Sequence, residues 1–214
     1  NSQRVADLSF GLLLTIARQI AYTNMLVHNG IWQTAVGTDV FGKTLGILGL
    51  GAIGKNVALR AEGFSMRVLA YDPYVDTIPA NLSFVSLKDL EYVLQNSDFL
   101  SLHLPLTEET FKLLTEDRLL QMKRGSYIIN TAKGELIDED ALFKVLKSKH
   151  LAGAAMDVCT IEPIAPSNPL LSLENVVITP HIGVYSKEAI AMVSLICAKN
   201  IVALKKGLPI SFVI

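Results

Sequence analysis

A glycine-rich segment of the form GxGxxG runs from Gly49 to Gly54, with Gly51 at its second glycine position. An apolar run typical of a buried strand precedes it and a helical pattern follows it. In that context Gly49 allows a tight turn, Gly51 lets the backbone approach a pyrophosphate, and Gly54 lets helix and strand pack closely. The amide groups of Ala52 and Ile53 then lie at a helix start and face the anion. The segment therefore predicts a dinucleotide site.

An acidic residue ends the next apolar run. Asp72 follows Tyr71 and stands 23 positions after Gly49. At this place in a strand–helix–strand unit a carboxylate binds the ribose hydroxyls of NAD. It would repel the 2′-phosphate of NADP, and no Arg follows it directly, so we predict NAD as the cofactor. The alternative is that the glycines serve only a turn and Asp72 only ends a strand.

Polar residues also gather at or just after the ends of four later apolar runs. The candidate cofactor and substrate residues there are His103, Leu104, Pro105 and Thr110, then Thr131, Ala132 and Lys133, then Asp157 and Glu162, and finally His181 and Gly183. Because the carboxyl ends of parallel strands meet at one edge of a sheet, where ligands bind in such folds, we expect these groups to lie together.

Four of these side chains have the chemistry that hydride transfer to a carbonyl compound requires. His181 is the candidate general acid and base, because imidazole exchanges a proton near neutral pH. Glu162 would favour the protonated imidazolium, and Lys133 would hold a substrate carboxylate and polarise its carbonyl. Asp157 would accept a hydrogen bond from the nicotinamide carboxamide. Taken singly, each residue has an ordinary explanation as turn or loop chemistry, and no metal site is predicted.

The elements needed to position these residues alternate between strands and helices. Strands are predicted at 45–48, 67–71, 84–87, 99–104, 127–130, 154–158 and 176–179, and helices at 53–62, 88–94, 116–122, 138–147 and 187–205. Ser86, Thr115 and Asp138 are the predicted N-caps of three of the helices. Alternation of this kind predicts an α/β fold, a Rossmann-type doubly wound parallel sheet.

The composition excludes several classes of protein. Hydrophobic residues make up 50% and charged residues 18%, with a net charge of −1, so neither nucleic acid nor an anionic membrane is an expected partner. The longest apolar runs are ten residues, against about 20 for a membrane-spanning helix. The two cysteines do not form a CxxC pair, which favours a cytoplasmic, reducing location. The apolar excess fits a sheet that is covered on both faces.

The first helical pattern spans about residues 3–24 and is apolar on two faces. Val5, Leu12 and Ile16 lie on one face, whereas Phe10 and Leu13 lie on the other. Two apolar faces indicate burial on two sides. The helix belongs either to one large core or to an interface between subunits or domains.

The motifs together resemble the D-isomer-specific 2-hydroxyacid dehydrogenases, a family that includes D-3-phosphoglycerate dehydrogenases. The resemblance covers essentially the whole chain. It rests on the stretches at 42–54, 71–74, 103–110, 122–125, 129–134, 138–142, 157–163 and 179–183. It implies reversible hydride transfer between NAD(H) and a D-2-hydroxy acid or its 2-oxo acid, 3-phosphoglycerate among the candidates. It also implies a homodimer formed through the dinucleotide domain, with the first helix contributing.

The resemblance also assigns roles, and the sequence departs from the family pattern at three of the matching positions. The family's catalytic Glu and His fall on Glu162 and His181, but its catalytic Arg falls on Lys133. Lysine keeps the charge and lacks the two-pronged bond to a carboxylate. Ala52 stands where many relatives have an Arg near the pyrophosphate, which predicts weaker cofactor binding. Ser65 replaces a customary Gly, with little predicted effect.

The resemblance begins at the family's hinge helix. It therefore implies that residues 1–204 form the dinucleotide-binding domain, that 205–214 return toward a largely absent substrate domain, and that this piece alone turns over little substrate. The alternatives are an NAD-sensing, corepressor-like interaction module and, less favoured, a dehydrogenase acting on formate or phosphonate-like substrates. The formate enzymes have a Gln as the partner of the catalytic His, where this chain has Glu162.

Overall fold

Seven parallel strands form one sheet in the order β3-β2-β1-β4-β5-β6-β7 in the computed structural model, which describes residues 2–210. The strands are β1 (Thr44–Leu48), β2 (Arg67–Tyr71), β3 (Val85–Leu87), β4 (Phe99–Leu102), β5 (Tyr127–Asn130), β6 (Gly153–Met156) and β7 (Val176–Ile178). The chain builds β1 to β3 toward one edge and then returns past β1 to build β4 to β7 toward the other. The predicted doubly wound α/β fold is confirmed.

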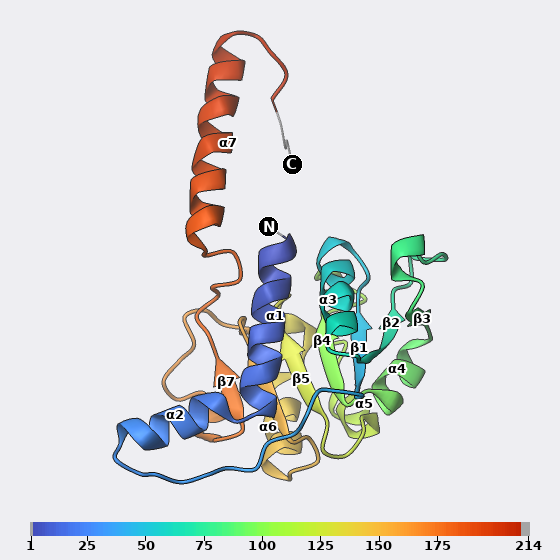
Figure 1. Ribbon diagram of the computed structural model, residues 1–214, viewed down its shortest axis with the longest axis vertical. Helices are drawn as coiled ribbons and strands as arrows, with labels where there is room; N and C mark the ends of the chain where they lie inside the picture. Colours follow the sequence, from blue (N-terminus) through green and yellow to red (C-terminus); the bar gives the residue numbers. More distant parts are fainter. Residues whose placement is uncertain (1, 211–214) are drawn as a thin grey trace.

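Helices cover both faces of this sheet (Figure 1). They are α1 (Ser2–Ala17), α2 (Ile20–His28), α3 (Ala52–Gly63), α4 (Leu90–Asn96), α5 (Glu116–Gln121), α6 (Glu139–Lys147) and α7 (Lys187–Lys205), with short 3-10 turns at Ala80–Leu82, Gly134–Leu136 and Pro169–Ser172. Residues of α1 and α3 belong to the buried cluster on one face, and residues of α4, α5 and α6 to the cluster on the other. The sheet is therefore packed between two apolar layers, one on each face.

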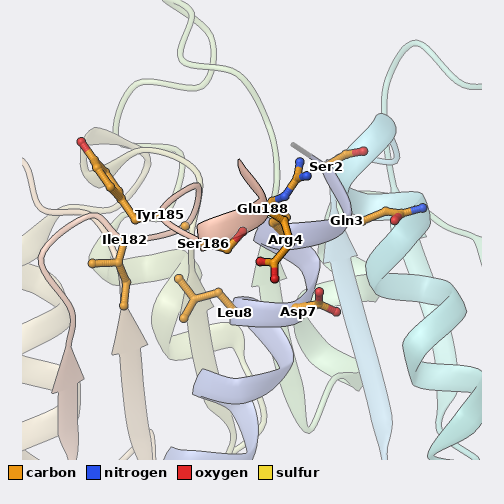
Figure 2. Close-up of a pocket in the computed structure, with 10 residues that line it drawn as sticks. Ser2, Gln3, Arg4, Asp7, Leu8, Ile182, Tyr185, Ser186 and Glu188 are labelled. Carbon is orange, nitrogen blue, oxygen red and sulfur yellow. The ribbon is translucent and has the colours of Figure 1, made fainter. Parts of the chain in front are cut away.

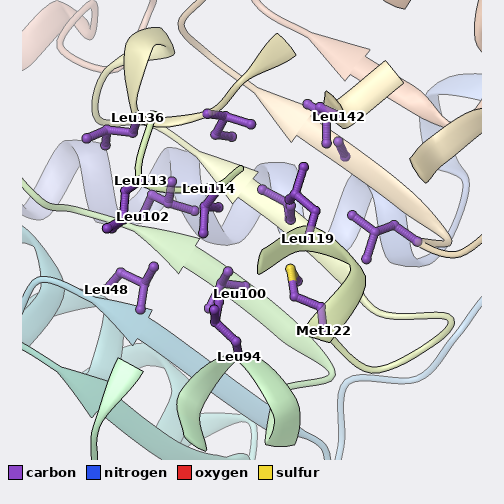
Figure 3. Packing of buried hydrophobic residues seen from close by; sticks show 14 of the residues in the cluster. Leu48, Leu94, Leu100, Leu102, Leu113, Leu114, Leu119, Met122, Leu136 and Leu142 are labelled. Carbon is purple, nitrogen blue, oxygen red and sulfur yellow. The ribbon is translucent and has the colours of Figure 1, made fainter. Parts of the chain in front are cut away.

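The core is aliphatic on both faces. Leu48, Leu100 and Leu102 project from neighbouring strands onto Leu94 and Leu119 of the covering helices, and all five are completely buried (Figure 3). Burial of each such side chain contributes roughly 1.5–3 kcal/mol before the cost of ordering the chain is counted. The strands are buried on both sides, which accounts for the high hydrophobic fraction and the scarcity of charge.

The single helix predicted over residues 3–24 is wrong, because the chain bends by 65° between α1 and α2. Gln19 adopts a left-handed conformation with φ of 53° at the break. The carbonyl oxygen of Ala17 accepts a hydrogen bond from Thr38 N at 2.7 Å, and Gln19 Nε2 donates to Val36 O at 2.9 Å. Residues 36–38 therefore end α1 through tertiary contacts, which the local sequence pattern does not predict.

Both apolar faces of α1 are buried within this one chain. Phe10, Leu12, Leu13 and Ile16 are each at most 5% exposed, so the single-core interpretation is right for α1 itself. The exposed apolar groups of this region lie instead on α2 and on residues 29–41, where Trp32 is 90% exposed.

The N-cap predictions hold at two of three helices. Thr115 accepts a hydrogen bond from Arg118 N at the start of α5, and Asp138 accepts one from Ala141 N at the start of α6. Ser86 is not a cap, since it lies in β3. Asp89 caps α4 through a 2.7 Å bond from Tyr92 N, because the pairing of β3 with β2 keeps the chain extended through Leu87.

The last helix, α7, has the predicted bounds and extends away from the sheet (Figure 1). In the described part of the chain no single helix is long and apolar enough to cross a membrane, and only the bent pair of α1 and α2 reaches that length and composition together.

Candidate cofactor and proton-transfer site

The glycine segment forms the turn between β1 and α3 that the sequence predicts. Gly49 has a φ of +97°, and a Cβ there would lie 2.7 Å from the backbone of His103. A Cβ at Gly54 would overlap the carbonyl oxygen of Gly49, so this glycine lets α3 pack directly on the turn. A Cβ at Gly51 would meet nothing. The backbone at Gly51 is thus open to a ligand, at the N-terminus of α3, where Ala52 is the first residue.

Asp72 lies across from this turn at the end of β2. One carboxylate oxygen accepts a hydrogen bond from Leu50 N at 2.7 Å, and the other accepts one from Tyr74 N at 3.0 Å. The carboxylate is therefore fixed against the glycine turn with lone pairs still free for ribose hydroxyls. An open backbone at a helix start and a fixed acid beside it are the groups that a dinucleotide requires, so the residues present fit NAD.

The segment after β4 runs alongside the glycine turn. His103 Nε2 lies 2.8 Å from Ser101 Oγ, and its buried Nδ1 has no hydrogen-bond partner among the described residues. Burial lowers the pKa of His103 to about 3, so the imidazole is neutral at physiological pH and is unsuited to proton exchange there. Thr110 Oγ1 donates to Pro105 O at 2.7 Å and shapes the loop, whereas Leu104 is buried.

His181 and Glu162 form the pair that the sequence predicts. His181 Nδ1 lies 2.8 Å from Glu162 Oε2, and Glu162 Oε1 accepts a 2.9 Å hydrogen bond from Cys159 N. Partial burial opposes ionisation of Glu162, but the bonds from His181 and Cys159, together with the charges of His181 and Lys133, hold its pKa below the usual value. The His181 side chain is 50% exposed and Nδ1 is bound to Glu162, so Nε2 is the nitrogen left for a substrate.

Lys133 follows β5 and is exposed, and its charge acts on Glu162. Its loop is fixed by backbone-directed bonds from Asn130, whose Oδ1 accepts from Ala132 N at 3.0 Å and whose Nδ2 donates to Lys133 O at 2.8 Å. A Cβ at Gly134 would overlap the backbone of Cys159. The loop that presents Lys133 thus packs directly on the loop that presents Glu162.

Asp157 is buried and serves the His181 loop. Its carboxylate accepts hydrogen bonds from Thr179 Oγ1 at 2.5 Å, from Ile182 N at 2.8 Å and from Gly183 N at 2.8 Å. These three bonds hold the turn in which His181 adopts a φ of +55°. The predicted bond from Asp157 to a nicotinamide carboxamide stays a prediction, for which a carboxylate with four acceptor directions still has one free.

The structure therefore brings Lys133, Glu162 and His181 together and places the glycine turn with Asp72 at the same sheet edge. Sequence reasoning missed four supporting residues, namely Ser9, Asn130, Gly134 and Thr179. Asn130 and Gly134 flank the polar run at 131–133, which was a usable signal, since an amide side chain and a glycine are typical of a fixed turn. Thr179 begins the stretch 179–183 that carries the family resemblance, whereas Ser9 had no such signal.

A pocket of about 680 Å³ lies between the start of α1 and residues 182–188 (Figure 2). Arg4 and Asp7 line one side, and Tyr185 and Glu188 the other. Of the predicted site residues only Gly183 lines it. The pocket is adjacent to the His181 turn and separate from the glycine turn. No group of three His, Cys, Asp or Glu side chains within residues 2–210 is placed to hold a metal ion.

Comparison with known proteins identifies the family. Residues 10–183 match the family model for the D-isomer specific 2-hydroxyacid dehydrogenase, NAD binding domain. The chain is 42% identical over 212 residues to a glyoxylate reductase of Korarchaeum cryptofilum, covering 96% of this chain and 64% of that protein. It is 40% identical over 212 residues to a D-3-phosphoglycerate dehydrogenase of Archaeoglobus fulgidus, covering 98% of this chain and 40% of that protein.

Solved structures support the same family assignment. A glyoxylate reductase from Paecilomyes thermophila superposes with a TM-score of 0.88 at 34% identity, covering 98% of this chain and 64% of that one. D-lactate dehydrogenase from Escherichia coli superposes with a TM-score of 0.90 at 33% identity, covering 98% and 66%. The chain thus spans less than two thirds of the length of the first curated relatives it matches. It belongs to the D-isomer specific 2-hydroxyacid dehydrogenase family and contains that family's NAD-binding domain.

Proposed function

We propose that the protein that contains this chain reduces a 2-oxo acid to the D-2-hydroxy acid with NADH, and catalyses the reverse reaction with NAD. The observation that carries the proposal is the His181–Glu162 pair, held at 2.8 Å on the same sheet edge as the glycine turn and Lys133. A pure binding module has no need of an exposed imidazole aligned by a carboxylate.

Each residue has a distinct task in this reaction. NADH, when bound, supplies the hydride. Lys133 holds the substrate carboxylate through its charge, and protonated His181 donates its Nε2 proton to the carbonyl oxygen. Glu162 bonds Nδ1, which fixes the ring orientation and stabilises the imidazolium before it gives up the proton. In the direction of oxidation, neutral His181 takes the proton back from the hydroxyl.

The substrate is proposed at the level of a small 2-oxo acid. Relatives named glyoxylate reductase and D-3-phosphoglycerate dehydrogenase match the chain at nearly equal identity, which supports glyoxylate and the 2-oxo acid of 3-phosphoglycerate as the first two candidates. The ammonium group of Lys133 is a point charge, whereas an arginine guanidinium bonds a carboxylate at two points. The attraction of Lys133 for a carboxylate therefore depends little on the orientation of that group.

The test is a panel of 2-oxo acids with NADH on the full-length protein, with NADPH in place of NADH as the cofactor control. We expect turnover with at least one short 2-oxo acid and a marked preference for NADH, because Asp72 repels a 2′-phosphate. Binding of NADH without turnover of any member of the panel would contradict the proposed enzyme.

A second candidate function is an NAD-sensing interaction module, and Lys133 in place of the family's Arg favours it. The variant K133R distinguishes the two. For an enzyme that works with lysine we expect a change in KM for the 2-oxo acid of less than about tenfold, with kcat retained. A gain in kcat of a hundredfold or more would instead indicate that the natural chain has lost most of its catalytic power and serves chiefly to bind NAD.

We also propose that two copies associate through α2 and residues 29–41. Trp32, Val36 and Phe41 are 90%, 91% and 75% exposed, and several large apolar side chains exposed along one segment support an interface. Sedimentation analysis tests this, and W32E with V36E is expected to shift the protein to monomer. An unchanged sedimentation coefficient would contradict the proposal.

A further inference from the structure

A buried hydrogen bond joins the first helix to the loop that presents Lys133. Ser9 Oγ lies 2.8 Å from Thr131 Oγ1, across 122 positions of sequence. Ser9 also donates to Val5 O at 2.8 Å. Since Ser9 has one hydroxyl proton and gives it to Val5, Thr131 is the donor toward Ser9. The two residues are only 2% and 8% exposed.

The Thr131 hydroxyl is therefore directed toward α1, in a buried environment. Thr131 is the first residue after β5, two positions before Lys133. Because the Thr131 hydroxyl bonds Ser9 of α1, only the backbone of Thr131 can take the predicted part in cofactor binding. The side chain instead anchors the start of the Lys133 loop, whose middle is held by Asn130 and whose end packs at Gly134.

The same helix also contacts the His181 turn and the cofactor helix. A Cβ at Gly183 would lie 3.6 Å from Val5 Cγ2, in ordinary van der Waals contact. At the other side of α1, Arg60 of α3 bonds Asp7 at 2.6 Å and 2.8 Å. Helix α1 thus bonds to the Lys133 loop and to α3, which begins at the glycine turn, and it lies beside the His181 turn.

We infer that α1 sets the spacing between the cofactor half and the substrate half of the site, and that Ser9 is the positioning residue that does so for the Lys133 loop. Ser9 touches no reacting atom and acts through Thr131. Loss of the Ser9 hydroxyl leaves the buried Thr131 hydroxyl without an acceptor. This costs more free energy than removing both partners of the hydrogen bond. The loop relieves that cost by shifting Thr131, and Lys133 shifts with it. For its kinetic readout this inference rests on the proposed function.

The kinetic test compares S9A, T131V and T131S in the full-length protein, with glyoxylate and NADH as the probes. For S9A we expect KM for glyoxylate to rise about fivefold to twentyfold, with KM for NADH changed less than twofold. T131V is expected to give a smaller rise, because Ser9 keeps its bond to Val5, and T131S, which keeps the hydroxyl, a smaller rise than T131V. The double variant S9A/T131V is expected to be no worse than S9A, since the two groups act as a pair.

Ser97 supplies the matched control. It is a fully buried serine that donates to the carbonyl four residues earlier, Val93 O, as Ser9 does, but it lies near the opposite end of the strands, against Gly46. S97A is expected to lose stability without any change in KM for glyoxylate. Equal effects of S9A and S97A on KM would overturn the inference.

Amide hydrogen exchange decides the same question without catalysis. In S9A we expect the amides of residues 132–134 to lose about tenfold in protection, whereas S97A leaves them unchanged. If wild type reduces no 2-oxo acid, the proposed function fails and the exchange experiment still stands. Unchanged protection at 132–134 in S9A would refute a positioning role for Ser9.

Discussion

The cofactor half and the proton-transfer half of the sheet edge are built in opposite ways. The cofactor half is nearly continuous in sequence, since the glycine turn and Asp72 belong to one strand–helix–strand unit, and its work is done by backbone and one acid. The proton-transfer half brings together Lys133, Glu162 and His181 from three separate loops. Exposed side chains do its chemistry, and buried bonds at Asp157, Asn130 and Ser9 fix the loops. We therefore expect the cofactor half to be sensitive to substitutions that change its backbone shape. We expect the proton-transfer half to be sensitive to substitutions that change side-chain charge.

The largest effect should come from removing the proton donor. H181N keeps a residue that accepts a positive φ and the opportunity to bond Glu162, but it cannot exchange a proton. We expect kcat to fall about a thousandfold, within the range for general acid–base groups, while calorimetry shows NADH affinity within twofold of wild type. A parallel loss of NADH affinity would contradict the separation of the cofactor half from the proton-transfer half.

The next effect should come from filling the cofactor turn. In G54A the new methyl group overlaps the carbonyl oxygen of Gly49, so we expect a loss of about 3 kcal/mol in the free energy of unfolding, as for overpacked sites, and little NADH binding. Chemical denaturation and calorimetry measure the two quantities.

G51A is the matched control for that variant, because a Cβ at Gly51 meets no protein atom. We expect wild-type stability within about 1 kcal/mol, as for an exposed Gly-to-Ala change at a compatible backbone, together with weaker NADH binding. NADH affinity equal to wild type in G51A would show that the cofactor does not approach the backbone there.

A smaller effect should follow from neutralising Glu162. E162Q keeps a hydrogen-bonding partner for His181 but removes the negative charge that favours the imidazolium. A neutral partner supports the positively charged ring less well, so we expect kcat to fall about tenfold, while NADH affinity stays within twofold of wild type. On the acid side the wild-type pair persists until Glu162 protonates, and its pKa is held below the usual carboxyl value. A kcat equal to wild type in E162Q would contradict the role proposed for Glu162.

The smallest effect lies outside both halves. Ser65 follows α3 with a φ of 54°, and Met66 N closes the helix end by bonding Ala61 O at 3.0 Å. This end favours glycine, so S65G should raise the free energy of unfolding by about 0.5–1 kcal/mol and leave NADH binding unchanged. The expectation from sequence of little effect did not anticipate the positive φ.

S148G is the control for that gain. Ser148 also follows a helix, α6, but its φ is −76°. Glycine there relieves no strain, adds freedom to the unfolded chain and removes the bond from Ser148 Oγ to Val145 O. Urea denaturation should show a loss for S148G and a gain for S65G. Gains in both would mean that the left-handed conformation at Ser65 is not the cause.

Local sequence determined the parts of this protein that depend on neighbours along the chain. The strand–turn–helix around Gly49, the acid at Asp72, the caps at Thr115 and Asp138 and the full length of α7 follow from short patterns, because each is stabilised by groups a few residues apart. The pairing of Glu162 with His181 was also predictable, since parallel strands share one edge.

Only the tertiary structure decided what depends on contacts across the fold. The break after α1 is set by residues 36–38, and the neutral state of His103 by its partly buried place next to the glycine turn. The bond between Ser9 and Thr131 joins positions 122 apart. Their hydroxyls are ordinary in any sequence window, and they acquire a role because burial leaves each of them dependent on the few partners that the fold places within reach.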